Sequence, residues 1–268
     1  MKQKAIEIVL NKFERINKYL RKSGKRFHGG HIHLFRLEVK KLLSFFEMLS
    51  LKQSKTHFLK RLQKLYKILG KIRLIQLQKK AILITISKNH INLPTNYLKY
   101  LENDKHRLQK KAKYRIKNMK PLKTKRISKE LPNKIGPVIP REYFSLQINA
   151  LNNLLALEKP DEQSLHQIRK VLKNMLDDLP FMSGSKIQDF KYCTKDEMKC
   201  LESKIGEIHD ISLSLKLLVE APKCQYGIEE KQILTSIQNR WQKDKDDLRR
   251  QINLSVLMGT KEGILKGE

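Results

Sequence analysis

Three histidines, His28, His31 and His33, stand within six residues in the stretch HGGHIHLFRLEVKK (28–41). Clustered histidines could bind a metal, transfer protons or hold an anion. On a helix of about 100° per residue, His31 and His33 point in different directions. No Asp, Glu or Cys stands at helical spacing to complete a metal shell. We therefore expect no metal site, and we expect His28 and His31 to be loop or first-turn residues.

His33 instead belongs with the cations that follow it. On one helix, His33, Arg36 and Lys40 share a face, with Lys41 at its edge. The opposite face is apolar and predicts a core stripe, made of Phe35, Val39, Leu42, Phe46 and Leu49. The basic face is a candidate anion-binding surface, because arginine offers paired donors and lysine a compact charge.

The same spacing recurs 133 residues further on, in LHQIRKVLKNMLDDL. There His166, Arg169 and Lys173 repeat the basic face, and Lys170 adds a further cation. The apolar stripe keeps the same phase, with Ile168, Leu172, Met175 and Leu179. The second basic face is therefore a second candidate site.

Another pair of segments repeats at an offset of 136, ILGKIRLIQL (68–77) and KIGEIHDISL (204–213). Gly70 matches Gly206, and Arg73 matches His209. Two elements in the same order at nearly the same offset indicate an internal duplication. Both glycines interrupt helices, at about 1 kcal/mol each relative to alanine, and close helix approach is one reason to keep them.

The charge of the chain points to a polyanionic partner. Of the 268 residues, 40% are hydrophobic, a fraction typical of a globular protein. The formal net charge is nevertheless +30, which favours a polyanionic partner. Residues 1–150 hold 38 Lys+Arg against 8 Asp+Glu, whereas residues 151–268 hold 19 of each. A merely lysine-rich composition would not obviously empty one half of its acids. Two further basic stripes are predicted, Lys60, Lys64, Lys67 and Lys71, and His106, Lys110, Lys113 and Lys117.

Scarce glycine and proline and apolar spacings of three and four predict an all-α protein. The expected helices are 2–22, 30–50, 55–86, 94–119, 142–158, 161–179, 195–220 and 227–257. Residues 120–140 hold four of the eight prolines and cannot form a long helix. We therefore expect a four-helix bundle at 1–120, a linker at 121–140 and a second bundle at 141–268.

The remaining features favour a cytoplasmic protein. Cys193, Cys200 and Cys224 make an odd count without C-x-x-C spacing, which is typical of a reducing compartment. No stretch reaches the roughly 20 apolar residues of a membrane span. The first helix reads poorly as a signal peptide, because Glu7 interrupts its apolar run.

On these motifs the chain resembles the CHAD domain, the conserved histidine α-helical domain. That family shows, twice, a histidine followed by basic residues at i+3, i+7 and often i+8. HLFRLEVKK (33–41) fits at all four positions, whereas HQIRKVLKN (166–174) has Asn174 at the last. Leu176 and Asp177 stand where the family often has Arg-Tyr. The glycine segment resembles the family's LG-x-x-RD, with Asp210 retained but Leu74 at the first copy.

The resemblance implies two helical bundles related by a pseudo-twofold axis, with a basic groove between them that binds inorganic polyphosphate. It implies no cofactor, and the acidic E-x-E-x-K signature of triphosphatase relatives is missing from this sequence. We therefore expect a non-enzymatic polyphosphate-binding module, with granule association as one role. Binding of RNA or DNA backbones is the alternative, although single-strand binders usually add aromatic platforms that are scarce on these stripes.

Overall fold

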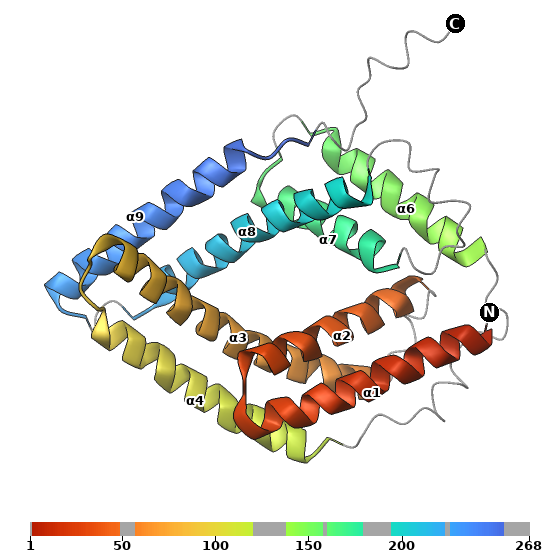
Figure 1. Ribbon diagram of the computed structural model, residues 1–268, viewed down its shortest axis with the longest axis horizontal. Helices are drawn as coiled ribbons and strands as arrows, with labels where there is room; N and C mark the ends of the chain where they lie inside the picture. Colours follow the sequence, from red (N-terminus) through yellow and green to blue (C-terminus); the bar gives the residue numbers. More distant parts are fainter. Residues whose placement is uncertain are drawn as a thin grey trace, which may run out of the picture. The chain divides into compact units, whose positions relative to one another are not determined.

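The computed structural model describes residues 2–48, 57–119, 138–157, 160–178, 194–222 and 226–254. This part of the chain is helical and contains no strand, which confirms the predicted all-α class. The helices are coloured along the chain in Figure 1. In order, they are α1 (Lys2–Arg26), α2 (Gly29–Met48), α3 (His57–Asn89), α4 (Thr95–Lys117), α6 (Val138–Leu155), α7 (Glu162–Asp178), α8 (Lys195–Glu220) and α9 (Ile228–Arg250).

The helices pack in two groups, as expected for two four-helix bundles. In the first, α1 packs on α2, α2 on α3, α3 on α4 and α4 back on α1. In the second, α6 packs on α7, and side chains of α8 and α9 contact α7. Each expected helix is present, so the sequence pattern located all eight elements of the described chain.

Contacts divide the chain into two compact units, residues 1–136 with 216–239, and residues 137–215 with 240–268. The boundaries fall within α8 and α9, whose adjoining ends pack with the first unit. The expected linker at 121–140 lies mostly outside the described residues, so the domain limits stay a prediction. The pseudo-twofold axis and the groove between the bundles also stay predictions.

The core of the first unit is built from the predicted apolar stripe of α2. Phe35, Val39 and Leu42 are fully buried and Phe46 is nearly so, whereas Leu49 lies outside the described residues. Ser44 stands four residues after Lys40, on the helical arc of the basic face, and it is also buried. At the end of α2 the buried surface therefore extends beyond the predicted apolar arc.

Several helix boundaries differ from the prediction by a few residues, and α9 ends at Arg250 rather than at residue 257. Two of the differences have a clear physical context. Helix α1 continues through Gly24 to Arg26, and Gly24 packs against α4, where an added Cβ would meet the Ile116 side chain at 3.2 Å. The chain then turns at Phe27, which has φ 49° and donates its N–H to the Ser23 carbonyl. Helix α6 begins at Val138, earlier than expected, since Pro140 in its first turn needs no N–H partner.

The start of α4 is held by a residue of α9. Pro94, at the N-cap of α4, forms no side-chain cap. Glu230 takes that role, because its carboxylate accepts the Tyr97 N–H and the Asn96 side-chain amide, each at 2.9 Å. Glu230 is buried, so these bonds satisfy a charge that would otherwise be expensive to desolvate.

Candidate functional site

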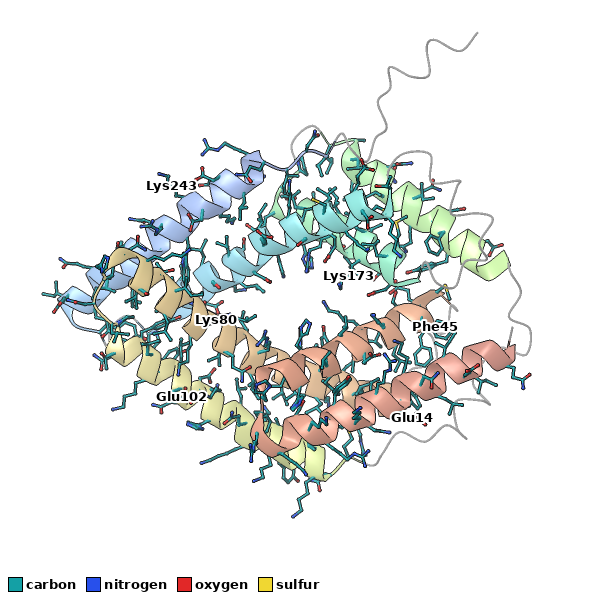
Figure 2. The ribbon with its side chains drawn as sticks, in the orientation of Figure 1. Glu14, Phe45, Lys80, Glu102, Lys173 and Lys243 are labelled. Atoms are coloured by element: carbon teal, nitrogen blue, oxygen red, sulfur yellow. The ribbon has the colours of Figure 1, made fainter. Side chains whose placement is uncertain are left out.

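The basic face predicted on α2 exists, and its members differ in exposure. His33 is exposed, whereas Arg36, Lys40 and Lys41 are half-buried. The core stripe on the opposite side of α2 fixes the direction in which this face points. Figure 2 shows the side chains along the helices. The first motif therefore presents a histidine and three cations on one side of a well-packed helix.

Arg36 lies against α3 at Tyr66 and Gly70. Its Nη1 donates to the Tyr66 carbonyl at 2.9 Å, and its Cζ stands 4.1 Å from the centroid of the Tyr66 ring. The guanidinium also covers Gly70, where an added Cβ would meet the Arg36 Cζ at 2.9 Å. Burial lowers the pKa of Arg36, an effect that its interaction with Tyr66 opposes, yet arginine stays charged at any ordinary pH.

The second motif repeats this arrangement on α7 and α8. Arg169 is half-buried and lies over Gly206, where an added Cβ would meet its Nε at 3.0 Å and its Nη2 at 3.1 Å. His166 and Lys170 are exposed, and Lys173 is half-buried. Gly70 and Gly206 therefore have the same function: each leaves room for the motif arginine of the neighbouring helix.

A carboxylate stands beside the second motif. The Glu202 Oε1 lies 3.1 Å from the Arg169 Nη2 and 3.8 Å from the Lys173 Nζ. Within the described residues, Arg36 has no such carboxylate partner. The two basic faces therefore have the same packing of an arginine over a glycine, but they differ in local charge.

His209, which matches Arg73 in the repeated glycine segments, is half-buried and lies beside the motif histidine. The ring centroids of His166 and His209 are 4.5 Å apart, with planes tilted by 32°. Burial lowers the pKa of His209, and the neighbouring His166 and Arg169 lower it further. His209 therefore resists protonation in the free protein, and a bound anion would oppose that shift.

The other predicted stripes are exposed, as any charged helix face would be. This holds for Lys60, Lys64 and Lys67 of α3 and for His106, Lys110, Lys113 and Lys117 of α4. His106 lies 3.4 Å from the Glu102 carboxylate, so when protonated it has a local counter-charge. Their role in binding an anion stays a prediction.

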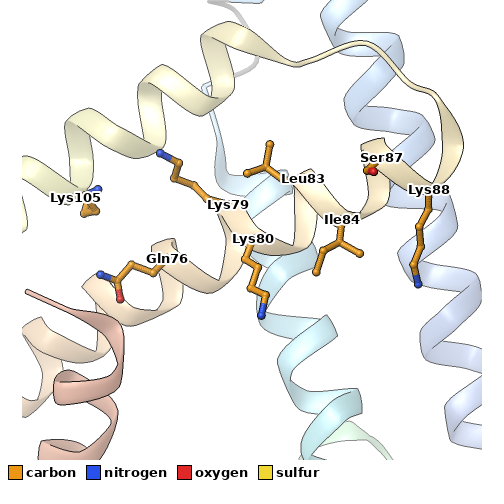
Figure 3. A pocket seen from close by; sticks show the side chains of 8 residues that line it. All are labelled: Gln76, Lys79, Lys80, Leu83, Ile84, Ser87, Lys88 and Lys105. Carbon is orange, nitrogen blue, oxygen red and sulfur yellow. The ribbon is translucent and has the colours of Figure 1, made fainter.

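A basic cleft on α3 and α4 contains residues that the sequence analysis did not select (Figure 3). Its volume is about 640 Å³. The lining is Gln76, Lys79, Lys80, Leu83, Ile84, Ser87, Lys88 and Lys105. Lys79 and Lys105 both pair with Glu102, whereas Lys80 and Lys88 are exposed. Lys80 and Lys88 stand eight residues apart, two turns along one helix face, and that spacing is the signal that could have identified them.

In the described ranges, no group of three or more His, Cys, Asp or Glu side chains could hold a metal ion. Nor does any helix there have the length and apolar character needed to cross a membrane. Cys200 is a free, exposed thiol on α8.

Comparisons with known proteins agree with this arrangement of helices. No family model matches the sequence, and no curated protein does. Among solved structures, the crystal structure of the CHAD domain from the plant Ricinus communis matches with a TM-score of 0.73 and 13% identity, over 100% of this chain and 92% of that chain. PptA from Streptomyces chartreusis matches with a TM-score of 0.64 and 9% identity, over 93% of this chain and 96% of that one.

Both matches span nearly the whole length of each chain, and at such identities they concern the fold. The protein therefore has the fold of a CHAD domain, and the resemblance expected from the two His-Arg-Lys motifs is confirmed at that level.

Proposed function

We propose that this protein binds inorganic polyphosphate, without catalysing a reaction on it, through the basic faces of α2 and α7. One observation carries the proposal: Arg36 and Arg169 hold equivalent places, each laid over a glycine of the neighbouring helix. A half-buried guanidinium held in a defined position loses less entropy on binding than a free surface side chain. Each arginine can then form charge-assisted hydrogen bonds to phosphate oxygens.

The charge distribution supports a long anion rather than a single phosphate. The surplus of 30 cations in residues 1–150 far exceeds what one phosphate group would need. In the first unit, the motif on α2, the stripe on α4 and the basic cleft each carry cations. A flexible chain with about one charge per phosphate could contact several such surfaces, which adds affinity by multivalency.

The alternative partner is single-stranded nucleic acid, and one residue favours it. Tyr114 is 72% exposed and stands among the lysines of the α4 stripe, where it could stack on a base. Phosphate backbones would bind the same cations with strong salt dependence. The two partners differ in whether Tyr114 contributes.

A competition experiment tests the proposal. The purified full chain is titrated with labelled long-chain polyphosphate, and unlabelled polyphosphate, single-stranded RNA and duplex DNA compete at fixed, near-physiological salt and equal phosphate concentration. We expect polyphosphate to compete best and Tyr114→Ala to leave its affinity unchanged. Equal or better competition by RNA, together with weaker RNA binding by Tyr114→Ala, would replace the proposal with nucleic-acid binding.

A further inference from the structure

Positions 66 and 202 correspond in the internal duplication, at the same offset as Gly70 and Gly206, yet their side chains differ in type and charge. Tyr66 offers the motif arginine a carbonyl oxygen and an aromatic face. Glu202 offers its arginine a negative charge. The first and second motifs therefore differ at the residue that contacts the arginine guanidinium.

Glu202 is placed to neutralise the second motif. Its side chain is 17% exposed, and it lies between Arg169 and Lys173, whose side chains are 22% and 28% exposed. Partial burial limits screening by water and salt, so one carboxylate compensates much of the charge of two motif cations. Asn174, at the place of Lys41, reduces the positive charge of this face again.

The ion pair is incompletely hydrogen-bonded. The Glu202 Oε1 and the Arg169 Nε are both buried, and neither has a hydrogen-bond partner of acceptable geometry, although the Oε1 lies 3.1 Å from the Arg169 Nη2. Buried polar atoms without partners are costly to a native structure. A phosphate oxygen that bonds the Arg169 guanidinium squarely would recover that loss, so the pair is suited to exchange.

We propose that Glu202 is a built-in competing anion of the second motif: in the free protein it holds Arg169 and Lys173, and a phosphate group must displace it. The inference rests on the proposed binding of polyphosphate. It makes the two motifs unequal, so that the first motif supplies most of the affinity and the second binds only after exchange with Glu202.

The test compares Glu202→Gln with Glu207→Gln in the full chain, using long-chain polyphosphate at near-physiological salt. Both changes remove one negative charge from α8, but Glu207 is exposed on that helix, and among the described residues no ion pair joins it to Arg169 or Lys173. If Glu202 competes, Glu202→Gln should bind about three-fold more tightly than wild type, the equivalent of a modest, partly exposed ion pair. Glu207→Gln should change affinity by much less.

The same change, Glu202→Gln, made in variants that already lack motif cations tests whether the gain in affinity comes from the second motif. In Arg169→Gln/Lys173→Gln, the further change Glu202→Gln should bring no tighter binding, because both cations that Glu202 holds are gone. In Arg36→Gln the gain should persist. Helical circular dichroism and thermal unfolding check each variant, and Glu202→Tyr, which copies the first motif, replaces Glu202→Gln if that variant unfolds.

The outcomes separate the inference from the proposed function. Equal effects of the two glutamine variants, or weaker binding by Glu202→Gln, would overturn the competing-anion role while wild-type binding stands. The second of these results would make Glu202 a positioning residue for Arg169. A wild-type protein that binds no polyphosphate would remove the proposed function itself.

Discussion

The guanidinium of Arg36 occupies the space that a side chain at position 70 would need. An added Cβ on Gly70 would lie 2.9 Å from the Arg36 Cζ, closer than real contacts allow. Gly206 stands in the same relation to Arg169. The two mid-helix glycines are therefore explained by the arginines that cover them, and the general expectation of close helix approach gains a specific partner.

This relationship predicts a measurable coupling between positions 36 and 70. In the Arg36→Ala background, Gly70→Ala should stabilise the protein by up to about 1 kcal/mol, since alanine favours helix. In wild type the same change should displace the guanidinium from Tyr66 and lose that gain. We expect a coupling of about 1 kcal/mol from a double-mutant cycle measured by urea unfolding. Additive effects would contradict the close contact.

The sequence located the fold and the motifs because periodicity records which side of a helix is buried. The phase of Phe35, Val39 and Leu42 was enough to place Arg36 on the other side of α2. Periodicity does not record what faces a residue from another helix. The contact of Gly70 with Arg36, and the pairing of Glu202 with Arg169, both join residues of different helices, so the sequence pattern could not predict them.

The same limit explains the residues that the sequence analysis missed. Glu230 begins a helix as an ordinary acidic residue, yet it caps α4, which is distant in the chain. Lys80 and Lys88 became candidates because α3 and α4 together form the cleft that they line. Contacts between elements far apart in sequence leave little trace in any single window of residues.

A matched-charge comparison tests whether the α2 motif is a site. Arg36→Gln/Lys40→Gln and Arg21→Gln/Lys22→Gln both remove two charges from the first unit, and Arg21 and Lys22 are exposed on α1. If short charge-assisted bonds dominate, the motif variant should lose at least about ten-fold more affinity for polyphosphate, or about 1.4 kcal/mol. Equal losses would assign binding to the general field of the protein.

The ion pairs of Glu102 with Lys79 and Lys105 predict that the free energy of unfolding falls at acid pH. Hydrogen bonds from Lys105 and Lys79 lower the pKa of Glu102 to about 2. A carboxyl with a depressed pKa contributes stability above its unfolded pKa, and that contribution is lost as the pH falls through the folded value. Since the side chain is 30% exposed, we discount it for screening and expect Glu102→Gln to cost about 1 kcal/mol near neutral pH.

Urea unfolding at about pH 6 and about pH 3 checks this expectation. The gap between wild type and Glu102→Gln should shrink at the lower pH, where Glu102 begins to protonate. Asp104→Asn is the control, because it removes the same charge from α4 but breaks a pair with Arg107 inside that helix. A gap that does not depend on pH would mean that the lysine pairing contributes nothing.

Glu230 should contribute more to stability than its neighbour Glu229. Glu230→Ala leaves the buried Tyr97 N–H without its acceptor, at an expected loss of about 1–2 kcal/mol. Glu230→Gln keeps one acceptor oxygen and should lose less. Glu229→Ala removes an exposed bond to Asn92 at 3.2 Å and should cost less than about 0.5 kcal/mol. Equal losses at 229 and 230 would rule out the capping role.

The last prediction concerns His209 and the pH dependence of the second unit. Burial, then His166 and Arg169, lower the pKa of His209, while Asp210 and Glu162 oppose them. Between the lowered pKa and the ordinary value of 6.5, the unfolded chain binds more protons at this position than the folded chain does. The free energy of unfolding must therefore rise with pH through that window and fall on acidification.

Chemical unfolding at about pH 7.5 and about pH 5.5 measures the effect, because the unfolded histidine, with an ordinary pKa of about 6.5, takes up its proton within that range. Wild type should lose more stability between the two values than His209→Gln, which cannot take up the proton. His90→Asn is the control, since His90 is exposed and its φ of 52° suits asparagine. That variant should keep the wild-type dependence. If His209→Gln also keeps it, the histidine pair does not govern the response of this unit to acid.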